Sequence, residues 1–400
     1  MTGPEPPAPS AQRPAPEAGL PAPSAQRPTP DLRRILIVRL GSLGDIVHAL
    51  PAVAALREAH PAAMIDWLVD RRNLEILRLT AVVDRAIVLE RPTLFGWLDV
   101  IRLMRRTPYD VAIDLQGLMK SAVLARASGA RRVLGFSRRH LREWTARPFY
   151  SETAEPAAGH VIEKNFALVV PLGACAGTWR FPLATTPSPA LDAVRASLAR
   201  DAEPSAGGTG LQPCDAEGTG GTGLQPCDAR FALINPGAAW ANKRWPADRF
   251  AAVARFLRER YGWRTVALWG PGEEPLARQV ADASSGAAIV APPTTIADLV
   301  ELSKAAALMV SGDTGPLHIA GAAGTPLVGL FGPTDPGRNG PWAAKDRSIS
   351  RYGRCGCPYR RRCRQSQWCL ADITVDEVTR TIEERLSSSS PASAGLVVPT

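Results

Sequence analysis

The sequence predicts an α/β protein made of two Rossmann-like parallel-sheet domains that face each other across a cleft. Its 400 residues are enough for two domains of ordinary size, each with its own core. In both halves, short apolar runs rich in β-branched residues alternate with segments of helical apolar spacing, as in parallel sheets covered by helices. A low-complexity segment with little to bury separates the halves.

Repeats and prolines set the domain limits. PAPSAQRP occurs at residues 7–14 and 21–28, and GGTGLQPCDA at 207–216 and 220–229. Such segments contain few side chains that can join a core. We therefore predict a disordered tail over 1–31, an N-terminal domain over 32–184, a flexible insert over 185–230, a C-terminal domain over 231–386 and a second disordered tail over 387–400.

Apolar periodicity places the elements in order along each half. In the first half we expect strands at 34–39, 64–69, 85–90 and 109–115 and helices at 45–58, 94–106 and 117–128. In the second half we expect strands at 230–237, 265–270, 287–290, 307–313 and 326–332, with helices at 247–260, 273–284, 295–304 and 316–323. Ligands of parallel sheets bind beyond the carboxyl ends of the strands, so the loops at those ends are the candidate sites.

Composition narrows the class of protein. The sequence has no run of about 18 consecutive apolar residues and no basic-then-apolar N-terminus, which predicts a cytoplasmic location. Seven cysteines, an odd number in a chain of this size, argue against a secreted disulfide framework. The net charge of +9 favours anionic partners, but it does not separate nucleic acid, membrane surfaces and acidic small molecules.

The first candidate loop follows the first expected strand and reads RLGSLGDIVH over residues 39–48. Its glycines permit a sharp turn close to a ligand. Asp45 stands at the start of a helix, where it can cap free N–H groups or act on a substrate. A dinucleotide site, with Gly41, Gly44 and Asp66, is the alternative, although the loop lacks the full G-x-G-x-x-G pattern.

The second candidate loop follows the strand at 307–313 and contains Asp313, Thr314, Gly315 and His318. Pro316 suits the first turn of a helix, so the loop should present unpaired backbone N–H groups and a positive dipole to a diphosphate. A structural role for His318 is the alternative. Asp-Thr-Gly also occurs in aspartic proteases, but the alternation of strands and helices argues against that β architecture.

Two further strand ends carry charged residues. Lys243 or Arg244, in NKRWP, can neutralise phosphate or lie on a solvated surface. Glu273, in WGPGEE, can accept hydrogen bonds from the two hydroxyls of a ribose or simply interact with a helix dipole.

Together these motifs resemble family 9 glycosyltransferases, the ADP-heptose:lipopolysaccharide heptosyltransferases, over about residues 33–184 and 231–386. The segments that carry the resemblance are RLGSLGDIVHALPAV, IDLQGLMKSA with RRVLGF, NKRWP, WGPGEE and GDTGPLHIAGAAGTPLVGLFGPTDP. The first two, and HVIEKN at 160–165, are similar to heptosyltransferase I in particular.

This resemblance implies a GT-B fold, inversion at the anomeric carbon, and no cofactor or obligatory metal. It implies an acceptor-binding N-terminal domain and a C-terminal domain that binds ADP-heptose. In the family pattern Asp45 is the general base. The donor site would contain Lys243, Glu273, Asp313, Thr314, Gly315 and His318. The acceptor would be Kdo-lipid A or a heptosylated inner core, at the inner face of the inner membrane.

A basic stretch at 131–147 is the candidate acceptor site, because guanidinium groups pair with the carboxylates and phosphates of an inner core. We expect Arg138, Arg139 and Arg142 to bind acceptor and Trp144 to reach the membrane interface. A merely basic surface is the alternative. The stretch has no recognisable nucleic-acid-binding fold around it, so we expect no nucleic-acid partner.

Four cysteines, Cys355, Cys357, Cys363 and Cys369, can hold structural zinc or serve as small buried residues. Two functions other than glycosyl transfer also stay open at this point: an NAD-dependent oxidoreductase, and a protein that binds a nucleotide sugar without turnover. The sequence leaves open whether the acceptor is that of a heptosyltransferase I, II or III.

Overall fold

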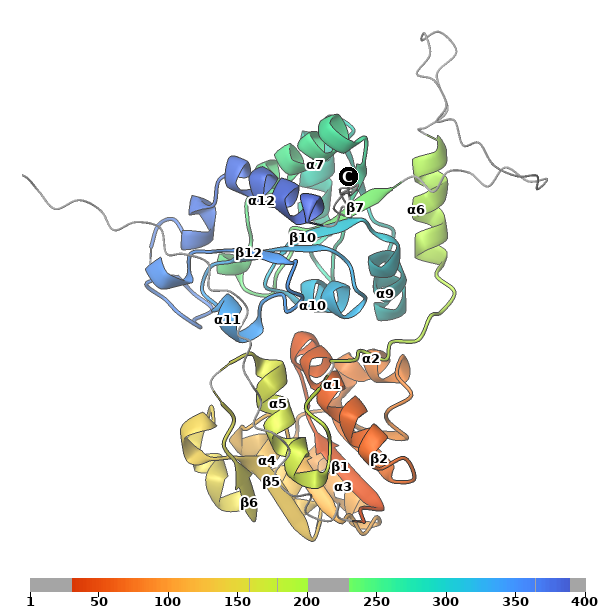
Figure 1. Ribbon diagram of the computed structural model, residues 1–400, viewed down its shortest axis with the longest axis vertical. Coiled ribbons are helices and arrows are strands. Elements are labelled where there is room, and N and C mark those ends of the chain that lie inside the picture. The colour runs from red at the N-terminus through yellow and green to blue at the C-terminus, as the bar shows by residue number, and fades with distance from the viewer. Residues whose placement is uncertain (1–30, 158, 178, 201–229, 364, 389–400) are drawn as a thin grey trace, which may run out of the picture.

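Two parallel six-stranded sheets, one in each half of the chain, form the framework of the molecule. The computed structural model describes residues 31–157, 159–177, 179–200, 230–363 and 365–388. The strand orders are β3-β2-β1-β4-β5-β6 and β12-β11-β10-β7-β8-β9. The two halves stack one above the other, with helices on both faces of each sheet (Figure 1). The expected two-domain α/β architecture is confirmed.

In the N-terminal domain, β1 (Arg34–Val38) lies at the centre and pairs with β2 and β4. The other strands are β2 (Met64–Asp70), β3 (Arg85–Leu89), β4 (Val111–Asp114), β5 (Arg132–Phe136) and β6 (Glu152–Ala154). The helices are α1 (Leu43–Ala59), α2 (Leu74–Arg78), α3 (Leu94–Arg105), α4 (Met119–Ala127) and α5 (Val161–Val169). The central strands are apolar on both sides because helices cover both faces.

The C-terminal domain repeats this plan around β7 (Phe231–Asn235), whose five residues are all buried. Its other strands are β8 (Arg264–Ala267), β9 (Ala288–Val290), β10 (Leu308–Gly312), β11 (Leu327–Phe331) and β12 (Arg347–Ser350). Its helices are α7 (Ala247–Tyr261), α8 (Glu274–Ala283), α9 (Ile296–Ala305), α10 (Gly315–Ala322), α11 (Pro336–Asn339) and α12 (Val375–Ser387).

Helix α6 (Pro189–Arg200) corrects the sequence interpretation, which placed this segment in a flexible insert. Ala190, Val194 and Leu198 recur every four residues and are buried, and α6 packs against α9 of the C-terminal domain. The flexible insert is therefore wrong over 189–200, where helical apolar spacing was overlooked. It is also wrong at 185–188, where the Ser188 hydroxyl donates to Oδ1 of Asp298 in α9 at 2.7 Å. Residues 201–229 of the predicted insert lie outside the described residues, as do 1–30 and 389–400 of the tails predicted over 1–31 and 387–400; Ser387 is the last residue of α12.

The remaining predicted elements are found within a few residues of their expected ends. The short strands β5, β6 and β12 and the helices α2, α5, α11 and α12 were not predicted. In the part of the chain that the structure describes, no helix is both long enough and apolar enough to span a membrane.

The domains meet where the first turns of α1 and α10 approach each other. A Cβ atom on Gly44 would lie 2.3 Å from Cδ2 of His318, and one on Gly315 would lie 3.0 Å from Cδ2 of Leu43. Each glycine therefore makes room for a side chain of the opposite domain. Helix α2 makes a second contact, in which the backbone N–H of Ala297 donates to Glu75 Oε1 at 3.0 Å.

Three imidazoles gather at this interface. The ring of His48 lies 4.4 Å from that of His318 and 5.3 Å from that of His160, centroid to centroid. Nε2 of His160 lies 3.0 Å from the carbonyl oxygen of Gly340, across the interface. Burial lowers the pKa of His160 to about 4 and the pKa of His48 well below its usual value. Both rings are therefore neutral at pH 7.

We expect the free energy of unfolding to fall as the pH drops below about 6.5, the ordinary histidine pKa. The unfolded chain takes up protons there, whereas His160 resists protonation until about pH 4. The stability that His160 contributes is thus present above pH 6.5 and is lost as the pH falls toward 4. Between pH 7 and pH 5 this loss amounts to about 2 kcal/mol for one such histidine.

Urea unfolding of the wild type and His160→Gln at pH 7 and pH 5 measures this effect, and His140→Gln, on a surface turn, is the control. The pH-dependent loss should be about 2 kcal/mol smaller in His160→Gln than in the other two proteins. Equal losses in all three would show that His160 does not sense pH.

Candidate functional site

A cavity of about 480 Å³ lies between the two domains at the carboxyl ends of both sheets. Both domains line it, so its shape depends on how they pack. The N-terminal domain contributes Ser42, Gly44, Asp45, His48 and Arg142. The C-terminal domain contributes Trp240, Lys243, Asp313, Thr314, Gly315, His318, Thr334, Arg338, Asn339 and Tyr359. The cavity thus unites most of the residues that the sequence pointed to in separate loops.

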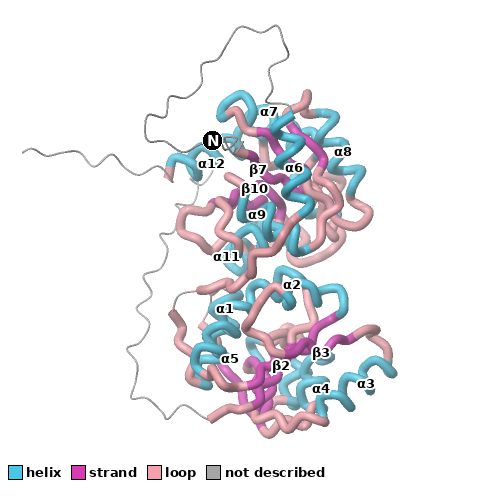
Figure 2. The backbone as a smooth tube through the Cα atoms, turned by 90° about the vertical axis from the view of Figure 1, so that its right-hand side faces the viewer, coloured by secondary structure: helices cyan, strands magenta, loops and turns pink. Residues whose placement is uncertain are grey.

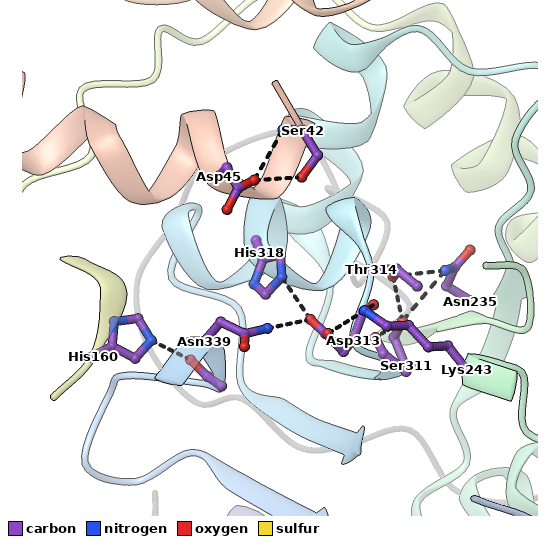
Figure 3. Close-up of polar contacts among 12 residues, drawn as sticks. Ser42, Asp45, His160, Asn235, Lys243, Ser311, Asp313, Thr314, His318 and Asn339 are labelled. Atoms are coloured by element: carbon purple, nitrogen blue, oxygen red, sulfur yellow. Dashed lines mark hydrogen bonds and ion pairs between the residues drawn. The ribbon is translucent and has the colours of Figure 1, made fainter. Parts of the chain in front are cut away.

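Asp45 sits in the first turn of α1 and both caps the helix and faces the cavity. Its Oδ2 accepts hydrogen bonds from the backbone N–H and the hydroxyl of Ser42, both at 3.1 Å. Its Oδ1 lies 2.8 Å from Nη2 of Arg39, which is nearly buried and also donates to the carbonyl oxygen of Leu115. These bonds hold the carboxylate in one orientation above the second domain (Figure 3).

The charge state of Asp45 follows from the same contacts. Burial alone would raise the pKa of its carboxyl group. The Arg39 guanidinium and the hydrogen bonds from Ser42 lower the pKa by more, with a further contribution from Arg338. The pKa of Asp45 therefore lies below its usual value, and the group is a carboxylate at neutral pH.

Asp313 follows β10 and binds three side chains from three loops (Figure 3). Its Oδ2 lies 2.5 Å from Nζ of Lys243. Its Oδ1 accepts from Nδ2 of Asn339 at 2.7 Å and lies 3.1 Å from Nε2 of His318. Burial would raise the pKa of Asp313, but His318 and Lys243 hold it well below the usual range. The carboxylate thus fixes the loops around it.

Thr314 and the start of α10 form the polar floor of the cavity. The Thr314 hydroxyl accepts a hydrogen bond from Nδ2 of Asn235 at 3.1 Å and lies 3.1 Å from the Ser311 hydroxyl. Asn235 is the last residue of β7, so neighbouring strands position the loop. The first N–H groups of a helix have no intrahelical acceptor, and they carry the positive end of its dipole. An anion is therefore favoured in front of Gly315.

Lys243 and Glu273 occupy the loops after β7 and β8. The Lys243 ammonium lies 4.7 Å from the centre of the Trp240 ring, which orients it toward the cavity.

Glu273 does not line the cavity. It folds over the backbone of Gly237, where a Cβ atom would lie 2.1 Å from Oε2, and its Oε1 is 3.7 Å from Nη2 of Arg244. Arg244 thus pairs with Glu273. Of the two cations in the NKRWP segment, Lys243 is the one that lines the cavity.

The sequence interpretation missed the loop after β11, which contributes Thr334, Arg338 and Asn339 to the cavity. Arg338 is the most informative of these. Its charge helps to lower the pKa of Asp45, and burial together with the Arg338 charge lowers the pKa of Lys164. Its guanidinium lies 5.7 Å from the centre of the Tyr359 ring. One feature of the sequence could have pointed to Arg338: it follows an expected strand, as the other candidate loops do.

The basic stretch at 131–147 divides into two groups. Arg131, Arg132 and Arg147 have structural partners, namely Asp110, Glu152 and the carbonyl oxygen of Tyr150. Arg142 instead lines the interdomain cavity. Arg138 and Arg139 line a second cavity, of about 570 Å³, together with Ser137, Trp144 and Glu155. Within it, Nη2 of Arg139 forms an ion pair with Oε1 of Glu155 at 3.1 Å. The Arg138 guanidinium stacks 4.8 Å from the centre of the Trp144 ring.

The four cysteines lie in the C-terminal domain as free thiols. Cys357 and Cys369 are buried, and Nδ2 of Asn242 lies 3.9 Å from the sulfur of Cys357. Burial raises the pKa of Cys357 to about 12, so this thiol is protonated. No group of three or more potential ligands is placed to hold a metal ion within the described ranges. Zinc binding stays a prediction here.

The geometry of β2 argues against a dinucleotide site. Asp66 lies inside the strand, its side chain is buried, and it accepts hydrogen bonds from Tyr109 and Arg85. It is therefore not free to bind a ribose. Gly44, the second glycine of the alternative dinucleotide-binding loop, is covered by His318.

Comparison with known proteins identifies the family of this chain. The model of glycosyltransferase family 9 (heptosyltransferase) matches residues 97–369. Lipopolysaccharide heptosyltransferase 1 of Pseudomonas aeruginosa is 31% identical over 77% of this chain and 81% of its own length. The corresponding Salmonella typhimurium enzyme is 26% identical over 76% of this chain and 90% of its own length.

Solved structures share the fold. The E. coli heptosyltransferase WaaC with ADP superposes with a TM-score of 0.63 at 23% identity, over 88% of this chain and 98% of the other. A family 9 glycosyltransferase from Veillonella parvula gives a TM-score of 0.68 at 21% identity, over 89% and 98%. These likenesses establish the GT-B arrangement. Neither the oxidoreductase nor a non-catalytic binding protein is supported. The chain belongs to glycosyltransferase family 9 and is a glycosyltransferase.

Proposed function

We propose that this enzyme transfers heptose from ADP-heptose to the inner core of lipopolysaccharide, with inversion and without a metal ion. The observation that carries the proposal is the single cavity in which Asp45 of one domain faces Lys243, Thr314 and the start of α10 of the other. The relatives named lipopolysaccharide heptosyltransferase 1 support the reaction class. A solved structure of E. coli heptosyltransferase WaaC with ADP-2-deoxy-2-fluoro heptose supports ADP-heptose as the donor.

Asp45 acts as the general base in this proposal. The acceptor hydroxyl oxygen attacks the anomeric carbon of heptose as its proton passes to the Asp45 carboxylate, and the bond from that carbon to the diphosphate oxygen breaks on the opposite face. ADP leaves with the bonding electron pair. The bonds from Ser42 and Arg39 keep the carboxylate ionised and aimed at the cavity, so that little reorganisation precedes proton transfer.

The donor site stabilises the negative charge that develops on the departing diphosphate. Lys243 and Arg338 provide cations, the Thr314 hydroxyl provides a hydrogen bond, and the first turn of α10 provides backbone N–H groups. Asp313 and His318 hold these groups in place and are positioning residues. We assign the hydrogen bonds of the ribose hydroxyls to Glu273, which precedes α8 in the loop after β8.

Arg142, Arg138 and Arg139 bind the acceptor. Arg142 lines the same cavity as Asp45, where it can pair with a carboxylate of Kdo next to the attacking hydroxyl. Arg138 and Arg139 line the second cavity and are exposed, as expected for groups that bind the more distant phosphates or carboxylates of an inner core.

Asp45→Asn should abolish most turnover and leave ADP affinity nearly unchanged. The amide keeps the shape of the side chain but cannot accept the proton, so kcat should fall about 10²–10⁴-fold. Initial rates with ADP-heptose and a Kdo-bearing acceptor, together with calorimetric ADP titration, test this. Near-normal turnover in Asp45→Asn would mean that the carboxylate only caps α1. The control is Asp192→Asn, at an exposed position of α6, which should keep wild-type turnover.

Lys243→Ala should weaken ADP binding and thereby reduce the thermal protection that ADP gives to the C-terminal domain. At a ligand concentration of 100 times Kd, the wild type gains about 2.7 kcal/mol from binding. The control Lys304→Ala, whose side chain pairs with Glu301 away from the cavity, should retain full protection. EDTA should change neither the protection nor the rate, and a rate that requires an added divalent ion would refute the metal-free mechanism.

Arg138→Gln with Arg139→Gln should raise the KM for acceptor in a salt-dependent way and leave the KM for donor unchanged, because the lost guanidinium groups act on an anionic acceptor. The matched control is Arg131→Gln, since the Arg131 side chain is similarly exposed and pairs with Asp110, as Arg139 pairs with Glu155, but lines neither of the two cavities. Equal changes in both KM values would remove this pair from the acceptor site.

A further inference from the structure

Two partly buried cations at the domain interface have no charged partner among the described residues. Lys164 belongs to α5 of the N-terminal domain, and Arg338 belongs to α11 of the C-terminal domain. Within the described ranges, neither the Lys164 ammonium nor the Arg338 guanidinium forms an ion pair or a hydrogen bond. Cations that leave water normally have such partners in folded proteins. The pair therefore calls for a ligand of opposite charge.

The packing of α5 against α11 directs the two cations to the same part of the interface. Nε2 of His160, which precedes α5, lies 3.0 Å from the carbonyl oxygen of Gly340, which follows α11. The backbone N–H of Lys164 donates to the carbonyl oxygen of His160 at 3.1 Å, so Lys164 lies one turn farther along the same side of the helix. Its side chain leans back toward the start of α5 and hence toward the loop that carries Arg338.

The arrangement of the two helices can be followed in both views of the backbone. Helix α11 lies on the side of the C-terminal domain that faces the N-terminal domain, and α5 lies below it (Figure 1 and Figure 2). Arg338 lines the interdomain cavity, and its guanidinium lies 5.7 Å from the centre of the Tyr359 ring. The two cations thus approach the edge of the cavity from opposite domains.

The charge of Arg338 acts on groups of the N-terminal domain. Burial lowers the pKa of Lys164, and the Arg338 charge lowers it further. The same charge adds to the effects that lower the pKa of Asp45 and of His160. Like charges repel one another more strongly where water is partly excluded. The interface therefore holds an excess of positive charge when no ligand is bound.

The carboxylates of this region are already engaged. Asp45 and Asp313 have the partners described above. Glu163 and Asp335 cap the first turns of α5 and α11, where they accept hydrogen bonds from backbone N–H groups at 3.2 Å and 2.8 Å. In the described part of the chain, none of these four carboxylates lies within ion-pairing distance of either cation. The compensating anion must therefore come from outside the chain.

We propose that Lys164 and Arg338 together bind one anionic group of a substrate, a phosphate or a carboxylate, between the two domains. This inference deepens the proposed function and rests on it, because ADP-heptose carries a diphosphate and a Kdo acceptor carries a carboxylate. Ammonium and guanidinium groups both donate charge-assisted hydrogen bonds to such oxygens. Since Arg338 lines the same cavity as Asp45 and Lys243, the bound anion lies next to the reacting groups.

Binding of this anion links the two domains. In its absence the two cations repel each other across the interface. A bound anion attracts both of them and offsets that repulsion. The substrate that occupies the site thus holds Lys164 of one domain and Arg338 of the other at the same edge of the cavity.

Calorimetric titration of the full chain tests the proposal and separates the two sources of the anion. ADP and inorganic pyrophosphate probe the donor diphosphate, and a soluble Kdo-bearing acceptor probes the carboxylate. Lys164→Met and Arg338→Met remove the charge and keep an unbranched side chain. If the site takes a phosphate, both variants should bind ADP and pyrophosphate about tenfold or more weakly than the wild type. If it takes a carboxylate, both should bind the acceptor more weakly by that factor.

Control variants separate the loss of charge from the loss of fold. Lys164→Arg keeps the charge and should bind all three probes like the wild type. Lys345→Met removes an exposed lysine that lines neither cavity, and it should also bind them normally. The proposal is overturned if no probe is weakened by both Lys164→Met and Arg338→Met, because a shared anion must lose affinity in each.

Failure of the proposed function would be recognised separately. A wild-type protein that binds pyrophosphate but neither transfers heptose from ADP-heptose nor binds the Kdo-bearing acceptor would refute that function. The pyrophosphate titrations of the two Met variants would then still decide whether Lys164 and Arg338 share an anion.

Discussion

Asp313 carries a carboxylate that is almost completely buried, and removing such a charge from water costs several kcal/mol unless partners replace the lost solvation. Lys243, His318 and Asn339 are those partners, and they come from the loops after β7, β10 and β11. The side of the cavity formed by the C-terminal domain is thus assembled around one charge. His318 also packs against Gly44 and His48 of the N-terminal domain, so the same carboxylate is linked to the domain interface. Removing it would leave a buried ammonium group unpaired and would loosen both arrangements together.

The two explanations offered by the sequence for Asp45, a helix cap or a functional carboxylate, do not exclude each other. One carboxylate oxygen accepts from Ser42 and the other pairs with Arg39. Capping is what fixes the orientation that a base requires, and the nearly buried Arg39 keeps the group ionised. The cost is a pKa below the usual value, which weakens Asp45 as a base in the absence of substrate. Proton transfer concerted with attack on the anomeric carbon accommodates this weakness, because the acceptor hydroxyl becomes acidic only as the new bond forms.

The N-terminal domain distributes its charges and apolar groups along a single edge of its sheet. Asp45 follows β1, the apolar first turn of α3 follows β3, and the basic stretch follows β5. Parallel strands bring all three to the same side. The proposed acceptor residues therefore lie on the same side of the domain as Asp45.

The sequence by itself determined the two-domain α/β architecture and the loops that form the cavity, because strand and helix periods are local properties and ligands of parallel sheets bind at strand ends. It located Asp45, Lys243 and the Asp313 loop correctly within the cavity lining. It did not single out Arg338, because many charged residues share its position beyond a strand. It also did not reveal helix α6, which lies beside repeats that resemble a linker. Only the tertiary structure showed that Arg142 reaches the cavity whereas Arg131, Arg132 and Arg147 bind neighbouring strands and turns. Whether a cation is free or paired depends on residues far away in the chain, and packing alone brings them together.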